Sequence, residues 1–147
     1  VFMELGVHEH FWKVAQKPGK PLFFGTGNST LIFGLPGKPV SSYIGFMESD
    51  WPVLETMMGK TEMKKLTGIL KKPFPRDKSK HRFLFGKAWL EDGKLVCKPS
   101  TKTGSHMITS SLEANCLLES PPGDGLLVEG QSITASLLPW LSLGQER

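Results

Sequence analysis

Two turns rich in proline and glycine carry the residues of this sequence that are best suited to binding an anion. The first turn is Lys17-Pro-Gly-Lys-Pro21, preceded by Lys13, and the second is Pro36-Gly-Lys-Pro39, followed by Ser41. Ammonium groups, hydroxyls and unpaired backbone N–H groups are donors that stabilise a phosphate or another oxyanion. If strands bring the two turns to one rim, they form an anion cradle. The alternative is that each lysine is a solvated surface charge.

The second turn is predicted to connect a buried strand to a helix. Leu31 to Phe33 is a short apolar run typical of a strand. Pro36 and Pro39 each fix φ, and Gly37 between them can adopt conformations closed to other residues. Pro39 suits the first helical position, so the serines that follow lie in the first turn. The alternative is an ordinary strand-to-helix loop that the prolines stiffen.

The other catalytic residue types form no recognisable arrangement. His8 and His10 could bind a metal from one side of a strand, but no third ligand is evident. Glu48 and Asp50 are interpreted as ordinary helix-surface carboxylates. The sequence contains no nucleophile elbow, phosphate-binding loop or dinucleotide fingerprint. A turn at Thr103-Gly-Ser-His106 could add a hydroxyl to the cradle.

Composition is that of an ordinary globular protein. The chain is 39% hydrophobic and 22% charged, with a net charge of +4 that could favour an anionic ligand but does not argue for nucleic acid. It has no run of the roughly 18 apolar residues that a membrane span requires. Cys97 and Cys116 lack metal-ligand spacing and sit in apolar segments, which predicts buried free thiols in a reducing, cytoplasmic compartment rather than a disulfide.

An α/β portion is predicted to come first and to position the two turns. Residues 22–33 form a predicted hairpin around Gly25–Ser29. A helix is predicted from Pro39, because apolar side chains recur with helical spacing, and Pro52 either kinks it or starts a second helix ending near Met58. Residues 1–6 resemble the last turns of a helix, which suggests that the chain belongs to a longer polypeptide.

A β-rich portion is predicted after about residue 60. Asp92-Gly93 is a strong hairpin signal, and Ile133, Ala135 and Leu137 alternate with polar residues. The basic segment 71–80 is either a contact patch or a solvated loop. We therefore predict two domains, residues 1–62 and 63–147.

The two turns, in their surroundings, closely resemble one family. Lys13-Val-Ala-Gln-Lys-Pro-Gly-Lys-Pro21 and Leu31-Ile-Phe-Gly-Leu-Pro-Gly-Lys-Pro-Val-Ser41 are similar to motifs of the molybdopterin molybdenumtransferases (the MoeA type, to which the C-terminal region of gephyrin is related). Weaker matches follow in the family's order, at Gly104-Ser105, Ala114-Asn115, Pro121 and Glu129-Gly130. The resemblance covers essentially the whole chain.

The resemblance implies a fold and an activity. The fold would be α/β, the second half of a three-layer molybdopterin-binding domain, followed by a small C-terminal β-barrel. The family inserts molybdate into adenylylated molybdopterin with magnesium and releases AMP, and its members are homodimers. Lys13 and Lys17 would bind the oxyanion or phosphate, and Ser41 would cap the helix at the pocket. Pro36, Gly37 and Pro39 would shape that pocket, to which the barrel would add Ser105.

Two departures from the family pattern stand out. The family usually has Asn at the position of Lys38, and the lysine adds a positive charge there. The family's N-terminal regions, with the acidic residues that bind magnesium, have no counterpart in this sequence, so we expect the fragment alone to be inactive. The alternative function is a non-catalytic binding or scaffold module of the gephyrin type. An RNA-contacting domain is disfavoured, because aromatic and basic residues are not interleaved.

Overall fold

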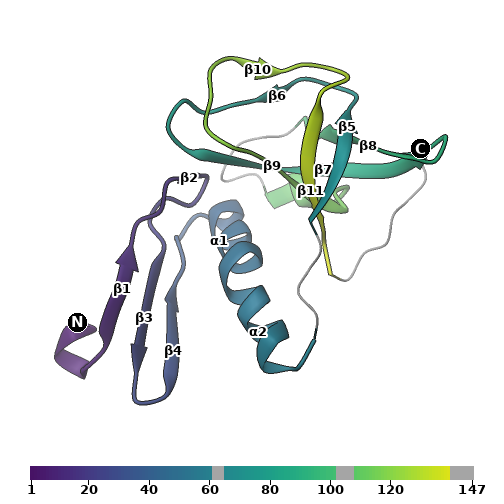
Figure 1. Ribbon diagram of the computed structural model, residues 1–147. Coiled ribbons are helices and arrows are strands. Elements are labelled where there is room, and N and C mark those ends of the chain that lie inside the picture. Colours follow the sequence, from purple (N-terminus) through teal and green to yellow (C-terminus); the bar gives the residue numbers. More distant parts are fainter. Residues whose placement is uncertain (61–64, 102–107, 140–147) are drawn as a thin grey trace.

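The computed structural model describes residues 1–60, 65–101 and 108–139, and it has two parts (Figure 1). A small sheet and a long helical segment come first, and a β-barrel follows. The first part comprises η1 (Met3–Leu5), β1 (His8–Trp12), β2 (Gln16–Lys17), β3 (Phe23–Gly27), β4 (Thr30–Gly34), α1 (Pro39–Gly45), η2 (Phe46–Asp50) and α2 (Trp51–Met57). The second comprises β5 (Lys65–Leu70), β6 (Phe74–Pro75), β7 (His81–Glu91), β8 (Lys94–Pro99), η3 (Ile108–Ser111), β9 (Cys116–Ser120), β10 (Leu126–Leu127) and β11 (Ser132–Leu137).

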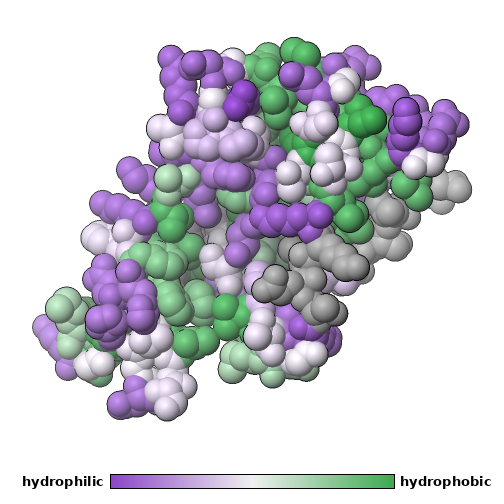
Figure 2. Space-filling view, in the orientation of Figure 1, coloured by the Kyte–Doolittle hydropathy of each residue, from purple (hydrophilic) through white to green (hydrophobic). Residues whose placement is uncertain are grey.

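Strands β1, β3 and β4 form an antiparallel sheet in that spatial order. The predicted hairpin is confirmed: β3 pairs with β4 around a two-residue turn at Asn28 and Ser29, whose φ angles are 44° and 66°. Left-handed backbone at both positions is the geometry that matches the twist of paired strands. Several large side chains of this part stay exposed, Trp12 at 59% among them, and Figure 2 shows hydrophobic surface over β3 and β4.

The helical segment continues through Pro52. Between α1 and α2, η2 is a π-helical turn, and the residues at both of its ends keep right-handed helical angles. Pro52 lies in the first turn of α2, where its missing N–H costs little. Of the two arrangements that the sequence allowed, the structure therefore has a second helix that joins the first without a break. Gly59, at φ 70°, follows its end.

The second part is a closed five-stranded barrel, in the order β7-β8-β5-β11-β9 with β9 pairing back to β7. Its core includes Leu70, Phe74, Leu84, Cys97 and Cys116, and both cysteines are free thiols, as predicted. The predicted turn at Asp92-Gly93 joins β7 to β8. An α/β portion followed by a small C-terminal β-barrel is thus confirmed as the fold class. The boundary predicted between residues 62 and 63 lies outside the described residues.

The two parts are joined by an apolar junction and by a shared sheet. Val40 and Ile44 of α1 pack on Phe83, Phe85 and Leu117, which project from the outer face of the barrel. In addition, β2 leaves the first part and pairs in parallel with β7 at the edge of the barrel sheet. These contacts fix the turn that carries Lys17 against the barrel.

A charged cluster lies at the same junction, and its burial contradicts one prediction. The Lys65 ammonium lies 2.8 Å from Glu119 Oε1 and 3.6 Å from Glu48 Oε2, and the Glu48 side chain is only 12% exposed. Burial raises the pKa of Glu48, and Lys65 offsets this only in part. Asp50 is also partly buried, with its pKa raised to about 6. The interpretation of Glu48 and Asp50 as ordinary surface carboxylates was wrong, because Glu48 is largely buried beside Lys65 and Asp50 Oδ1 is buried without a hydrogen-bond partner among the described residues.

Candidate anion-binding site

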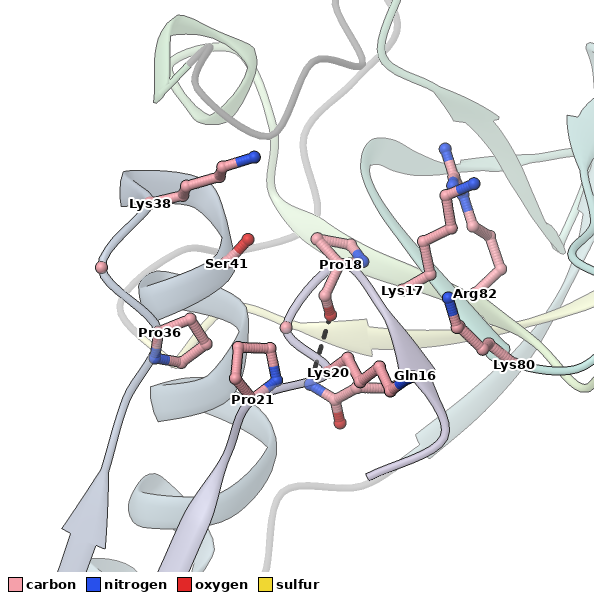
Figure 3. A pocket seen from close by; sticks show the side chains of 12 residues that line it. Gln16, Lys17, Pro18, Lys20, Pro21, Pro36, Lys38, Ser41, Lys80 and Arg82 are labelled. Atoms are coloured by element: carbon pink, nitrogen blue, oxygen red, sulfur yellow. Dashed lines mark hydrogen bonds between the residues drawn. The ribbon is translucent and has the colours of Figure 1, made fainter. Parts of the chain in front are cut away.

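A pocket of about 650 Å³ opens where the two parts meet (Figure 3). It is lined by the turn around β2, by the start of α1 and by the N-terminal end of β7. Five of the side chains that line it are cationic: Lys17, Lys20, Lys38, Lys80 and Arg82. The lining is completed by Gln16, Pro18, Gly19, Pro21, Pro36, Gly37 and Ser41.

The first wall is the turn that follows β2. Gln16 Nε2 donates a hydrogen bond to the Pro18 carbonyl oxygen at 3.3 Å, which closes the turn on itself (Figure 3). Gly19 has φ 97°, and a Cβ there would lie 2.7 Å from Gln16 Nε2, so only glycine fits without strain. Lys17 pairs in register with Arg82 across β2 and β7, which sets these two cationic residues side by side.

The second wall is the start of α1, where the predicted order of strand, turn and helix is present, but the strand, β4, is partly exposed rather than buried as predicted. Lys38 is the N-cap residue with extended backbone angles, and Pro39 is the first helical residue. Ser41 is 5% exposed and faces the pocket from the first turn. The N-cap is therefore Lys38 rather than Ser41, and no hydrogen bond from the Lys38 side chain to the described backbone caps the helix.

The third wall belongs to the barrel, and its residues Lys80 and Arg82 were not predicted from the sequence. Lys80 and Arg82 flank His81, whose N–H donates to the Ala15 carbonyl oxygen at 2.8 Å and so ties the end of β7 to β2. The only signal in the sequence was the basic segment 71–80, which was interpreted as a contact patch or a solvated loop. Ser105, the residue expected to contribute from the barrel, lies outside the described residues.

Two other predicted site residues lie apart from this lining. Lys13 has φ 72°, and its ammonium sits 4.6 Å from the centre of the Trp12 ring, a cation–π contact on the sheet side of the turn. Pro39 begins the helix behind the pocket wall. The structure thus brings together Lys17, Pro36, Gly37 and Ser41 of the predicted set, and the roles of all seven residues stay predictions.

The electrostatics of the pocket favour an anion. Burial lowers the pKa of Arg82 while the charge of Asp77 raises it, and the net lowering leaves an arginine that is still protonated at neutral pH. Lys17 Nζ lies 3.4 Å from Asp77 Oδ2, so Asp77 is an acidic neighbour of Lys17 as well as of Arg82. A guanidinium with several ammonium groups around one hollow binds phosphate or another tetrahedral oxyanion through charge-assisted hydrogen bonds.

The described residues offer little to a metal ion or a membrane. Among them, no group of three or more His, Cys, Asp or Glu side chains lies close enough together to hold a metal. His8 and His10 do contact each other, with ring centres 4.8 Å apart, but His10 also shares a hydrogen bond with Thr26. Within the described parts of the chain, none of the helices is long and apolar enough to cross a membrane.

Comparison with known proteins identifies relatives of this chain. Residues 67–138 match the family model of the MoeA C-terminal region (domain IV). The molybdopterin molybdenumtransferase of Haemophilus influenzae is 30% identical over 132 residues, which cover 85% of this chain and 32% of the relative. That of Bacillus subtilis is 28% identical over 140 residues, 94% of this chain and 33% of the relative.

A solved structure gives the same result. The molybdopterin biosynthesis moeA protein from Pyrococcus horikoshii OT3 superposes with a TM-score of 0.68 at 27% identity, over 88% of this chain and 32% of that one. The chain spans about a third of the length of the curated relatives it matches. Residues 67–138 therefore belong to the MoeA C-terminal family, and the chain as a whole is a relative of the molybdopterin molybdenumtransferases.

Proposed function

We propose that this chain supplies one wall of the active site of a molybdopterin molybdenumtransferase, which inserts molybdate into adenylylated molybdopterin and releases AMP. The observation that carries the proposal is the pocket with five cationic side chains between the first part and the barrel. The relatives that bear this enzyme's name match 85% and 94% of this chain. Molybdate is a tetrahedral dianion and the pterin substrate carries phosphates, so both suit a cationic pocket.

In this proposal the chain binds and orients its substrates. Arg82 and Lys80 of the barrel hold a phosphate or molybdate oxygen from one side, and Lys17 holds it from the turn after β2. Pro36 and Gly37 shape the opposite side, where Lys38 extends the positive charge toward solvent. Fixed charged donors of this kind lower the energy of a reaction in which negative charge moves between oxygens.

Other elements of the proposed activity lie outside the described residues. Among those residues, no group of three or more His, Cys, Asp or Glu side chains is placed to hold a metal ion. We propose that magnesium is held elsewhere in a longer homodimeric, cytoplasmic protein and that this chain alone is inactive. The scaffold function of the gephyrin type is the competing proposal.

Titration calorimetry with molybdate and with inorganic pyrophosphate tests the pocket directly. We expect both anions to bind, and Arg82→Gln to weaken pyrophosphate binding by about tenfold or more, because a charge-assisted hydrogen bond is lost. Lys94→Gln is the matched control, because Lys94 is an exposed residue next to the β7–β8 turn. Absence of binding by a folded chain, or equal effects of the two variants, would contradict the enzymatic proposal and favour the scaffold function.

A further inference from the structure

Asp77 lies in the segment between β6 and β7 and contacts the first and the third wall of the cationic pocket. Its Oδ2 is 3.4 Å from Lys17 Nζ, on the turn after β2. Its Oδ1 accepts hydrogen bonds from the backbone N–H groups of Ser79 and Lys80, at 3.1 and 3.0 Å. One carboxylate thus links the ammonium of one wall to the backbone that carries Lys80 and leads to Arg82 on the other.

The hydrogen bonds keep this carboxylate charged and in place. The backbone N–H of Ser79, with that of Lys80 and the Lys17 ammonium, lowers the pKa of Asp77. Ser79 also contributes its hydroxyl, 3.4 Å from Oδ1. Asp77 therefore remains an anion at neutral pH, and its orientation is set by the loop rather than by Lys17.

A fixed carboxylate beside an anion-binding pocket has two opposite effects. Its charge repels an incoming anion, and its ion pair with Lys17 competes with the anion for the N–H donors of that ammonium, so both effects weaken binding. It also restrains a long side chain that otherwise loses rotamer entropy when it binds a ligand. An ammonium has three donors, so Lys17 can contact Asp77 and a ligand at the same time.

We propose that Asp77 is a positioning residue that holds Lys17 beside Arg82, so that the two cationic side chains meet the same anionic group. The in-register pairing of Lys17 with Arg82 on β2 and β7 sets their backbones, and Asp77 sets the side chain that the backbone leaves free. The inference rests on the proposed function only for the ligand, a phosphate or molybdate oxygen. The restraint on Lys17 is a property of the ligand-free chain.

A double-mutant cycle with pyrophosphate as the probe separates positioning from charge. Asp77→Asn keeps an oxygen that accepts the loop hydrogen bonds but removes the ion pair. If Asp77 positions Lys17, this variant binds pyrophosphate about two- to fivefold more weakly, in spite of having lost a repelling charge. In a Lys17→Gln background the same change no longer weakens binding. Tighter binding by Asp77→Asn in the native background, or equal effects in both backgrounds, would overturn the inference.

A ligand-free measurement makes the inference independent of the proposed function. The ion pair with Asp77 predicts a side-chain ammonium signal of Lys17 in nitrogen-detected NMR spectra that weakens or shifts in Asp77→Asn. The control is Asp92→Asn, the same substitution at a hairpin turn whose φ of 50° asparagine tolerates well. An unchanged Lys17 signal overturns the positioning role even if pyrophosphate binds. If the Lys17 signal changes in Asp77→Asn but the wild-type chain binds no anion, the positioning role is supported and the proposed function is overturned.

Discussion

At the scale of single residues, Asp50 has a carboxyl group that the fold removes from water only in part. Oδ1 has no hydrogen-bond partner among the described residues, and burial raises the pKa of this carboxyl from 3.8 to about 6. A raised pKa in the folded state means that folding favours the protonated form. The stabilisation is complete below pH 3.8, the ordinary value, and is lost as the pH rises through about 6.

Asp50→Asn is therefore expected to stabilise the chain at pH 7.5 and to have a much smaller effect at pH 4. Two pKa units correspond to roughly 3 kcal/mol, but the side chain is partly solvated, so we expect about 1 kcal/mol. Thermal unfolding followed by circular dichroism from pH 4 to 8 measures the difference. Asp92→Asn, in an exposed turn, is the control and should follow the wild-type profile. A constant offset between Asp50→Asn and wild type at every pH would count against this explanation.

The residues of the pocket could be predicted from the sequence only in part. The turns of Lys17 and of Pro36 and Gly37 could be recognised because proline and glycine act on their own backbone. Arg82 was missed because its place in the site depends on the parallel pairing of β2 with β7, a contact between residues 65 positions apart in sequence. Lys13 was expected in the pocket because it flanks the first turn and because of the family resemblance, but its backbone is left-handed and its ammonium lies over Trp12.

At the scale of elements, Gly86 marks the point at which β7 changes partners in the barrel. It pairs with Pro99 of β8 on one side and with Cys116 of β9 on the other. A Cβ at this position would lie 2.6 Å from Leu118 Cδ1 and 2.7 Å from the Lys98 carbonyl oxygen. The second of these atoms is backbone, so the neighbouring strand would have to move.

Gly86→Ala is expected to lower the free energy of unfolding by about 1–3 kcal/mol through overpacking. Gly37→Ala is the matched control, because an added Cβ there meets nothing within 4 Å among the described atoms and φ is not left-handed. Urea denaturation of both variants gives the comparison. Equal stabilities of the two variants would mean that the barrel can relax around position 86.

The elements themselves were more predictable than their surroundings. The hairpins at Asn28 and at Asp92-Gly93 depend on local backbone preferences, so the residue types of the turn are enough to predict them. The passage of the helix through Pro52 by a π-helical turn was one of two open alternatives. The burial of Glu48 could not be read from its own segment, because the cluster that it joins also contains Lys65 and Glu119, and Glu119 lies about 70 residues later in the sequence.

At the scale of the whole molecule, the junction between the two parts combines an apolar contact with a charged one. Val40 and Ile44 pack on the barrel, and one turn further along the helix Glu48 meets Lys65 and Glu119. Two largely buried carboxylates thus share one ammonium, and that ammonium is half exposed. Since the pocket lies between the same two parts, this junction also determines how firmly the pocket walls are held.

Lys65→Gln is expected to destabilise the chain at pH 7 by about 1–3 kcal/mol, because it leaves Glu48 and Glu119 facing each other without their shared cation. Burial already raises the pKa of Glu48, and losing Lys65 raises it further. The folded variant therefore favours the protonated carboxyl, and its deficit shrinks as the pH falls toward 4. Lys71→Gln is the matched control: Lys71 also lies 2.8 Å from a carboxylate oxygen, that of Glu91, but the Glu91 side chain is 40% exposed, against 12% for Glu48 and 9% for Glu119. Differential scanning calorimetry of the two variants at pH 7 and pH 4.5 compares a cation that serves largely buried carboxylates with one that serves a more exposed carboxylate. A Lys65→Gln deficit that does not change with pH, or that Lys71→Gln matches, would show that the apolar contacts alone hold the two parts together.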